Sequence, residues 1–121
     1  MPRPTARPTI TSLRSQLRRF AEARDWQQFH TPKNLAMALS VEAAELLECF
    51  QWLTPEQSTQ LGGPERHAVE EEIADVLLYL LRLSDVLGID PLQAAQCKMA
   101  VNAGKYPVST SRGSARKPAQ R

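Results

Sequence analysis

The sequence predicts an all-α fold that is similar to a four-helix bundle, for three reasons. Apolar residues make up 42% of the 121 residues and are mostly Leu, Ala and Val, while aromatic residues are only 6%, a composition that suits helices better than sheets. Apolar residues recur three and four positions apart, which is the helical period. Cap residues, Pro and Gly separate the periodic segments, as they do at helix ends.

The first two helices are expected at about residues 10–24 and from Pro32 through Trp52. In the first, Thr and Ser caps precede four apolar residues at helical spacing: Leu13, Leu17, Phe20 and Ala21. In the second, Thr31 is the cap and Pro32 takes the first helical position, which is a common helix start. The second helix is expected to stop near residues 54–55.

Two more helices follow. Residues 55–60 are expected to form one short turn before Gly62 and Gly63 interrupt the chain. A third helix is expected to open at Pro64 and to stop at Gly88. Asp90 and Pro91 then form a cap and first-turn pair for a fourth helix, which ends before residue 107.

The predicted domain spans residues 9–107 and lies between two disordered tails, at 1–8 and 108–121. The domain carries nine basic against thirteen acidic residues, a formal charge of −4, and the remaining six bases lie in the tails. The net charge of +2 is therefore a property of the tails and does not indicate a nucleic-acid polymer as partner. A helical domain of this size often completes its core by forming oligomers.

The cysteines and the N-terminus indicate a cytoplasmic protein without a membrane partner. Cys49 and Cys97 form no C-x-x-C motif and are interpreted as small buried hydrophobic residues in a reducing compartment. The first residues lack the apolar stretch of a signal peptide. The longest apolar run is far too short to span a bilayer.

Two pairs of acids interrupt the apolar stripes of the second and third helices. Glu42 and Glu45 form one pair, and Glu72 and Asp75 form the other. Residues three apart point the same way on a helix, and an acid beside an apolar stripe is unfavourable unless something neutralises it. A hard divalent cation such as Mg²⁺, which prefers oxygen ligands, would do so. Ion pairs with Arg or Lys on neighbouring helices are the alternative explanation.

Helical geometry separates these acids from surface acids. At 100° per residue, the apolar stripe of the third helix comprises Val69, Ile73, Val76, Leu80 and Leu87. Glu72 and Tyr79 flank this stripe, whereas Glu70 and Glu71 face solvent. A carboxylate-held Mg²⁺ usually shares its shell with substrate phosphates, so the acids predict hydrolysis of a phosphate ester or anhydride.

Two further groups fit a nucleotide ligand. One side of the fourth helix and the residue after it carry donors suited to phosphate oxygens: Lys98, Asn102, Lys105 and Tyr106. A solvated basic face is the alternative. Rings near helix ends would stack on a base, and His30 beside them would hydrogen-bond to a base or phosphate; these residues are Trp26, Phe29, His30 and Trp52. Core filling, or a cap or surface role for His30, is the alternative there.

Three segments resemble the all-α NTP pyrophosphohydrolases of the MazG-like type, most closely the dCTP pyrophosphatase branch: RDWQQFHTPKNLAMALSVEAAELLECFQW, EEEIADVLLYLLRLSDVLGID and KMAVNAGKYP. The family motif, E-x-x-E followed by E-x-x-D, is matched by Glu42, Glu45, Glu72 and Asp75. The resemblance covers about residues 10–107. It implies cleavage of a nucleoside triphosphate between the α- and β-phosphates, with dCTP or a modified dCTP as substrate.

The resemblance also implies roles for single residues. The four acids would be the catalytic residues and hold Mg²⁺, with Mn²⁺ as an alternative ion. Lys98, Asn102, Lys105 and Tyr106 would meet the phosphates; His30, Trp26 and Trp52 would line the nucleoside pocket, with Tyr79 near the sugar. Subunits of this branch form dimers or tetramers, and a second chain contributes to the pocket. The rival functions are a non-catalytic helical dimer with a regulatory role, or the same enzyme class acting on dUTP or another non-canonical NTP.

Overall fold

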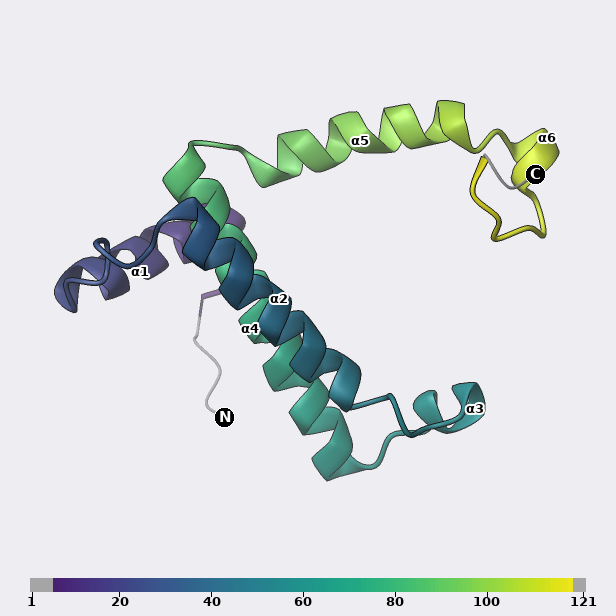
Figure 1. Cartoon of the computed structure of the whole chain (residues 1–121), viewed down its shortest axis with the longest axis horizontal. Coiled ribbons are helices and arrows are strands. Elements are labelled where there is room, and N and C mark those ends of the chain that lie inside the picture. The colour runs from purple at the N-terminus through teal and green to yellow at the C-terminus, as the bar shows by residue number, and fades with distance from the viewer. Residues whose placement is uncertain (1–5, 119–121) are drawn as a thin grey trace. The chain divides into compact units, whose positions relative to one another are not determined.

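The computed structural model describes residues 6–118 and shows six helices and no strand among them (Figure 1). The helices are α1 (Ile10–Ala23), α2 (Pro32–Glu48), α3 (Pro55–Ser58), α4 (Gly63–Leu87), α5 (Pro91–Lys105) and α6 (Val108–Ser111). The predicted all-α class is confirmed. Residues 1–5 and 119–121 of the predicted tails lie outside the described part of the chain, and α6 lies within the predicted C-terminal tail.

The chain divides after Gly88 into two compact units, the first containing α1 to α4 and the second α5 and α6. None of the helices in residues 6–118 combines the length and apolar character needed to cross a membrane.

The four long helices begin within one residue of their predicted starts, and α1, α4 and α5 also end almost where the sequence predicts. Thr9 Oγ1 accepts a hydrogen bond from the Ser12 amide at 3.0 Å, and Thr31 Oγ1 accepts one from the Asn34 amide at 3.2 Å. The side chain of Asp90 caps α5 in the same way. α4 ends at Gly88, whose φ of 68° lies in the left-handed region that a residue with a side chain rarely adopts.

The predicted end of the second helix is wrong by four residues. α2 stops at Glu48, where the backbone tightens: the amides of Cys49 and Phe50 donate to the carbonyls three residues back, those of Leu46 and Leu47, at 3.2 and 2.9 Å. Such tightening satisfies carbonyls that a helix end leaves free. Trp52 consequently lies on a turn, before the single turn of α3 that the sequence predicts.

The core of the first unit lies where α2 and α4 pack side by side and antiparallel, with α1 packed against α4 (Figure 1). Ala21, Leu35 and Leu81, one from each helix, are almost completely buried. Each helix therefore contributes to a core, and the packing brings the acid pairs of α2 and α4 to facing positions.

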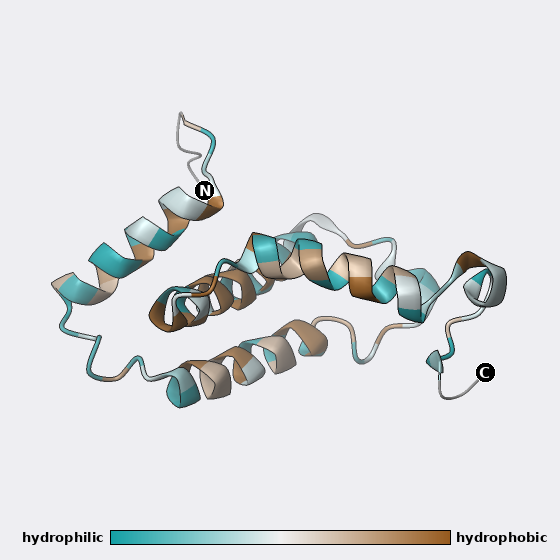
Figure 2. Ribbon diagram, turned by 90° about the horizontal axis from the view of Figure 1, so that it is seen from above, coloured by the Kyte–Doolittle hydropathy of each residue, from teal (hydrophilic) through white to brown (hydrophobic). Residues whose placement is uncertain are grey.

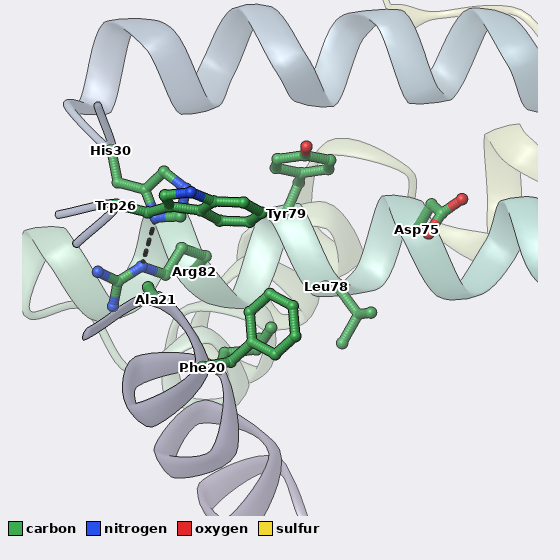
Figure 3. Close-up of a pocket in the computed structure, with 9 residues that line it drawn as sticks. Phe20, Ala21, Trp26, His30, Asp75, Leu78, Tyr79 and Arg82 are labelled. Atoms are coloured by element: carbon green, nitrogen blue, oxygen red, sulfur yellow. Dashed lines mark hydrogen bonds between the residues drawn. The ribbon is translucent and has the colours of Figure 1, made fainter. Parts of the chain in front are cut away.

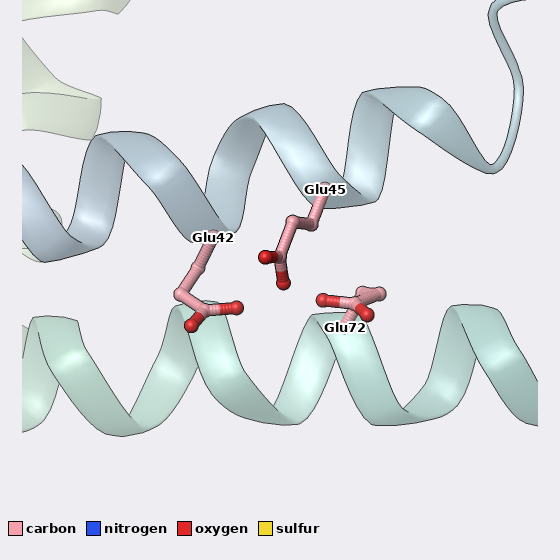
Figure 4. A group of neighbouring side chains, drawn as sticks. All are labelled: Glu42, Glu45 and Glu72. Atoms are coloured by element: carbon pink, nitrogen blue, oxygen red, sulfur yellow. The ribbon is translucent and has the colours of Figure 1, made fainter.

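Part of the predicted apolar stripe of α4 is not buried in this chain, contrary to expectation. Ile73, Leu80 and Leu87 are 52%, 43% and 49% exposed, and Leu77 beside them is exposed as well. Glu72 points toward α2 (Figure 4), and these residues are turned by roughly 60–140° from Glu72 around the helix. Figure 2 shows apolar residues (brown) along α4. An apolar ridge thus remains uncovered within the described residues.

The prediction that both cysteines are buried is half wrong. Cys49 at the end of α2 is partly buried, but Cys97 on α5 is exposed. The reason is that α5 has no buried residue at all, because its unit offers no apolar layer that would cover this face.

A charge network fastens α1 to α4. The Asp85 carboxylate, 7% exposed, accepts hydrogen bonds from Arg18 Nε at 3.0 Å and Nη2 at 2.6 Å, from Arg14 Nη2 at 3.3 Å and from Arg82 Nη1 at 3.4 Å. These donors, Arg18 first, hold the pKa of Asp85 below its usual value. One buried acid therefore ties two arginines of α1 and one of α4 together.

Replacing the central acid of this network should destabilise the protein. Asp85→Ala leaves three arginines close together without their counter-charge, and we expect the free energy of unfolding to fall by on the order of 3 kcal/mol. Urea unfolding followed by circular dichroism measures it. The matched control is Arg66→Ala, which removes an exposed ion pair with Glu70 and should change the value by less than about 0.5 kcal/mol. Equal effects of the two variants would contradict the role of the network.

Candidate functional site

Three carboxylates converge between α2 and α4. Glu42 and Glu45 on α2 and Glu72 on α4 each offer an oxygen within 4.8 Å of the others (Figure 4). Within residues 6–118, none of the three pairs with a lysine, arginine or histidine. Glu42 Oε2 and Glu72 Oε2 are buried and have no hydrogen-bond partner there. The ion-pair explanation of these acids therefore does not hold in this part of the chain.

The proximity of the carboxylates changes their proton affinity. The pKa of Glu42 is raised to about 7. The largest cause is burial, followed by the neighbouring carboxyl group of Glu45 and then by the charges of Asp75 and Glu72. Burial and the same neighbours, Glu45 foremost, also raise the pKa of Glu72. Like charges in partly desolvated surroundings disfavour ionisation. The carboxylates are therefore all ionised together only when a positive charge neutralises them.

The donor set fits a hard divalent cation. Carboxylate oxygens from facing helices are the ligands that such ions prefer, and two buried oxygens lack any other partner. Glu42, Glu45 and Glu72 would hold the ion. Asp75, one turn beyond Glu72 on α4, adds to the negative charge and lines the adjoining pocket.

An aromatic pocket lies beside the cluster. It is a cavity of about 180 Å³ between α1, the following loop and α4 (Figure 3). Its lining residues are Leu17, Phe20, Ala21, Trp26, His30, Asp75, Leu78, Tyr79 and Arg82. Trp26 contacts the Phe20 ring edge-on, with centroids 5.6 Å apart, and the His30 ring at 6.0 Å. The predicted residues Trp26, His30 and Tyr79 thus meet in one pocket, with Asp75 linking it to the acids.

One charged residue of the pocket, Arg82, is not predicted from the sequence. Arg82 Nε donates a hydrogen bond to His30 Nδ1 at 3.0 Å (Figure 3). Burial, and secondly the charge of Arg82, lower the pKa of His30 from its ordinary value. The available signal was an arginine within the apolar run LLYLLRLSDVL, three residues after Tyr79, where a charge needs a nearby partner.

The other predicted residues lie elsewhere in the structure. Trp52 is 87% exposed on the turn after α2 and does not line the pocket. The predicted phosphate-binding residues belong to the second unit: Lys98, Asn102 and Lys105 on α5, and Tyr106 at its C-cap. Asn102 is partly buried, while Lys98 and Lys105 are exposed. Their role remains a prediction.

Comparison with known proteins assigns the chain to a family. The profile of the MazG-like family matches residues 37–118, a range that includes all three clustered glutamates and Asp75. The chain belongs to the MazG-like family. The resemblance that the sequence predicts is thereby confirmed.

Individual relatives are similar over most of this MazG-like chain. It is 45% identical to dCTP pyrophosphatase 1 of Bos taurus, covering 92% of this chain and 67% of that protein. It is 44% identical to dCTP pyrophosphatase 1 of Homo sapiens, covering 91% and 66%. A crystal structure of a pyrophosphatase from Archaeoglobus fulgidus superposes with a TM-score of 0.78 at 44% identity, covering 88% of this chain and 99% of that one. The chain thus spans about two thirds of the curated relatives' length.

The acid cluster predicts an unusual dependence of stability on pH. Because the pKa of Glu42 rises from 4.5 to about 7 on folding, the folded state binds more protons than the unfolded state between these values. The contribution of Glu42 to stability is therefore present below about pH 4.5 and is lost as pH rises through about 7. We expect the metal-free protein to lose thermal stability over this window, and Mg²⁺ to restore it most at the upper end.

The measurement is the unfolding temperature of chelator-treated protein from pH 5 to 8, with and without MgCl₂. The control is Glu42→Gln, which cannot titrate at this position and should flatten the dependence. A Glu42→Gln variant with the same slope as the wild type would show that other groups cause it.

Proposed function

We propose that this MazG-like chain is a Mg²⁺-dependent nucleoside triphosphate pyrophosphohydrolase that hydrolyses dCTP or a modified dCTP to the monophosphate and pyrophosphate, and so cleans the nucleotide pool. The observation that carries the proposal is the convergence of three unpaired carboxylates beside a pocket with aromatic walls. A triphosphate site requires metal ligands, and a nucleoside site requires a slot for a flat ring. The relatives described above, dCTP pyrophosphatase 1 and an archaeal pyrophosphatase, support the same reaction.

The chain's acids have two tasks in this proposal. Glu42, Glu45, Glu72 and Asp75 hold Mg²⁺, or Mn²⁺ in its place. When bound, the ion lowers the pKa of water and stabilises charge on the phosphate oxygens. One of the glutamates orients the attacking water and accepts its proton, because carboxylate oxygens lie on both sides of the space between α2 and α4.

The pocket supports a pyrimidine base. The pocket is an open cleft of about 180 Å³, which has room for the single six-membered ring of a pyrimidine, since an apolar cavity of about 150 Å³ accommodates benzene. Trp26 and Phe20 offer faces for stacking, and Tyr79 lies beside the sugar. dCTP and dUTP both carry a base with one six-membered ring, so the substrate panel below decides which of the two is hydrolysed.

The remaining predicted residues complete the proposal. Lys98, Asn102, Lys105 and Tyr106 bind the phosphates, as a lysine–asparagine row with helical spacing would. Trp52, exposed in its own chain, lines the nucleoside pocket of a second copy. A cytoplasmic location remains a prediction.

We infer that the second copy forms a homodimer or homotetramer with this chain. The uncovered ridge of α4 supports this: Ile73, Leu77, Leu80 and Leu87 follow one another along the helix and are exposed. Exposed apolar side chains gathered on one face of a helix mark an interaction site in soluble proteins, and a chain this short gains core from a partner.

The enzyme proposal is tested with a panel of deoxynucleoside triphosphates in MgCl₂, with separation of the nucleotide products. We expect dCMP and pyrophosphate from dCTP. Glu45→Ala should lower turnover more than roughly a hundredfold, since even outer partners of metal ligands alter affinity 10–100-fold, while the helical circular dichroism signal is retained. The matched control is Glu71→Gln on the exposed side of α4, which should keep its activity.

The absence of monophosphate from every triphosphate would overturn the enzyme proposal. If calorimetry also showed no binding of Mg²⁺ or nucleotide at millimolar concentrations, the non-catalytic helical dimer would be the better description. Preference for dUTP or another non-canonical triphosphate over dCTP would keep the enzyme class and replace the substrate.

The oligomer inference predicts a change of mass. Leu80→Asp places a charge on the apolar ridge and should convert the assembly to monomers, because a buried unpaired charge opposes association. Light scattering coupled to size exclusion measures the mass. Glu70→Lys, an exposed change on the same helix, is the control and should keep the wild-type mass. A wild-type protein that elutes as a monomer would contradict the inference.

A further inference from the structure

The hydrogen bond between Arg82 and His30 determines where the imidazole carries its proton. Arg82 Nε lies 3.0 Å from His30 Nδ1. A guanidinium nitrogen has only N–H groups to offer and accepts nothing. Nδ1 must therefore present its lone pair, so the neutral imidazole carries its hydrogen on Nε2.

Arg82 is itself held in place. Its side chain is 8% exposed, and Nη1 reaches the Asp85 carboxylate at 3.4 Å. Asp85 is bound at the same time by Arg14 and Arg18 of α1. Because Nη1 binds Asp85 while Nε binds His30, the guanidinium plane has a fixed orientation.

The other nitrogen of His30 is available for a ligand. The His30 ring lines the aromatic pocket together with Trp26 and Tyr79 (Figure 3). Nε2 forms no hydrogen bond with any residue from 6 to 118. A polar atom with a defined hydrogen, in a largely apolar pocket, is the kind of group that orients a bound ring.

We propose that Arg82 is a positioning residue that holds His30 as a fixed Nε2–H donor and thereby selects bases that present an acceptor to this wall of the pocket. The ligand part rests on the proposed function. The ligand class is a pyrimidine nucleotide whose ring nitrogen or carbonyl oxygen faces His30. A base that turned an N–H or amino group to the same place would bring two donors together and leave both without an acceptor.

Arg82 differs from the other two arginines of the network in its position beside the pocket. Arg14 and Arg18 come from α1 and also bind Asp85, yet only Arg82 of the three lines the pocket. A purely structural Arg82 would be equivalent to Arg14, because both bind the Asp85 carboxylate, Arg14 at Oδ1 and Arg82 at Oδ2. This equivalence can be tested because Arg14→Met and Arg82→Met remove the same charge from the same network.

The first experiment observes the imidazole nitrogens of free protein labelled with ¹⁵N-histidine. The chain has two histidines, so His67→Gln assigns the His30 signals. We expect the Nε2–H tautomer in the wild type, in Arg14→Met and in Arg82→Lys, whose ammonium also only donates. Arg82→Met should show both tautomers. A wild-type His30 with its hydrogen on Nδ1, or an unchanged spectrum in Arg82→Met, would overturn the proposal.

The second experiment measures kcat and KM for dCTP. Arg82→Met should raise KM roughly tenfold, the effect of one lost hydrogen bond, with little change in kcat. Arg14→Met should stay near the wild type, and Arg82→Lys should recover most of the loss. Equal KM values for the two methionine variants would overturn the proposal.

Failure of the proposed function would be recognised separately. If the wild type hydrolysed no triphosphate, dCMP would be titrated into the labelled protein. Movement of the His30 Nε2–H signal would support a base-binding role without catalysis, and an unmoved signal would overturn the ligand part. If Arg82→Met did not fold, the wild-type tautomer and the Arg82→Lys kinetics would still decide.

Discussion

The repulsion among Glu42, Glu45 and Glu72 is the interaction on which the remaining features depend. α2 and α4 pack directly on each other, and their packing forces these carboxylates within 4.8 Å. Two of their oxygens are buried with no partner among residues 6–118. Such an arrangement opposes folding unless protons or a cation neutralise it.

The Asp85 network is the opposite solution to buried charge. There one carboxylate is surrounded by three guanidinium groups, and its pKa is lowered rather than raised. The network joins α1 to α4, and one of its members, Arg82, lines the aromatic pocket. Through Arg82 it continues to His30. The first unit thus contains two kinds of acid: Asp85, whose charge is neutralised by three arginines, and a cluster of glutamates without a basic partner among residues 6–118.

The acid cluster and most helix ends could be predicted because they depend on neighbouring residues. An i,i+3 pair of acids must share a helix face, and Thr9, Thr31 and Asp90 cap helices through amides two or three residues away. The end of α2 was predicted less well. The turns after Glu48 have no Gly or Pro until Pro55, and the sequence therefore carries no strong stop signal at that point.

The sequence by itself determined the helical class, the metal-suited acids and the aromatic residues of the loop before α2, since each is a matter of residue type and local spacing. Only the tertiary structure decided that Arg82 bonds to His30, 52 residues away, that Ile73 and Leu80 remain exposed, and that Trp52 stands outside its own chain's pocket. These outcomes depend on how α1, α2 and α4 rotate and pack. A periodic pattern shows that a helix has an apolar face, but not which neighbour covers it.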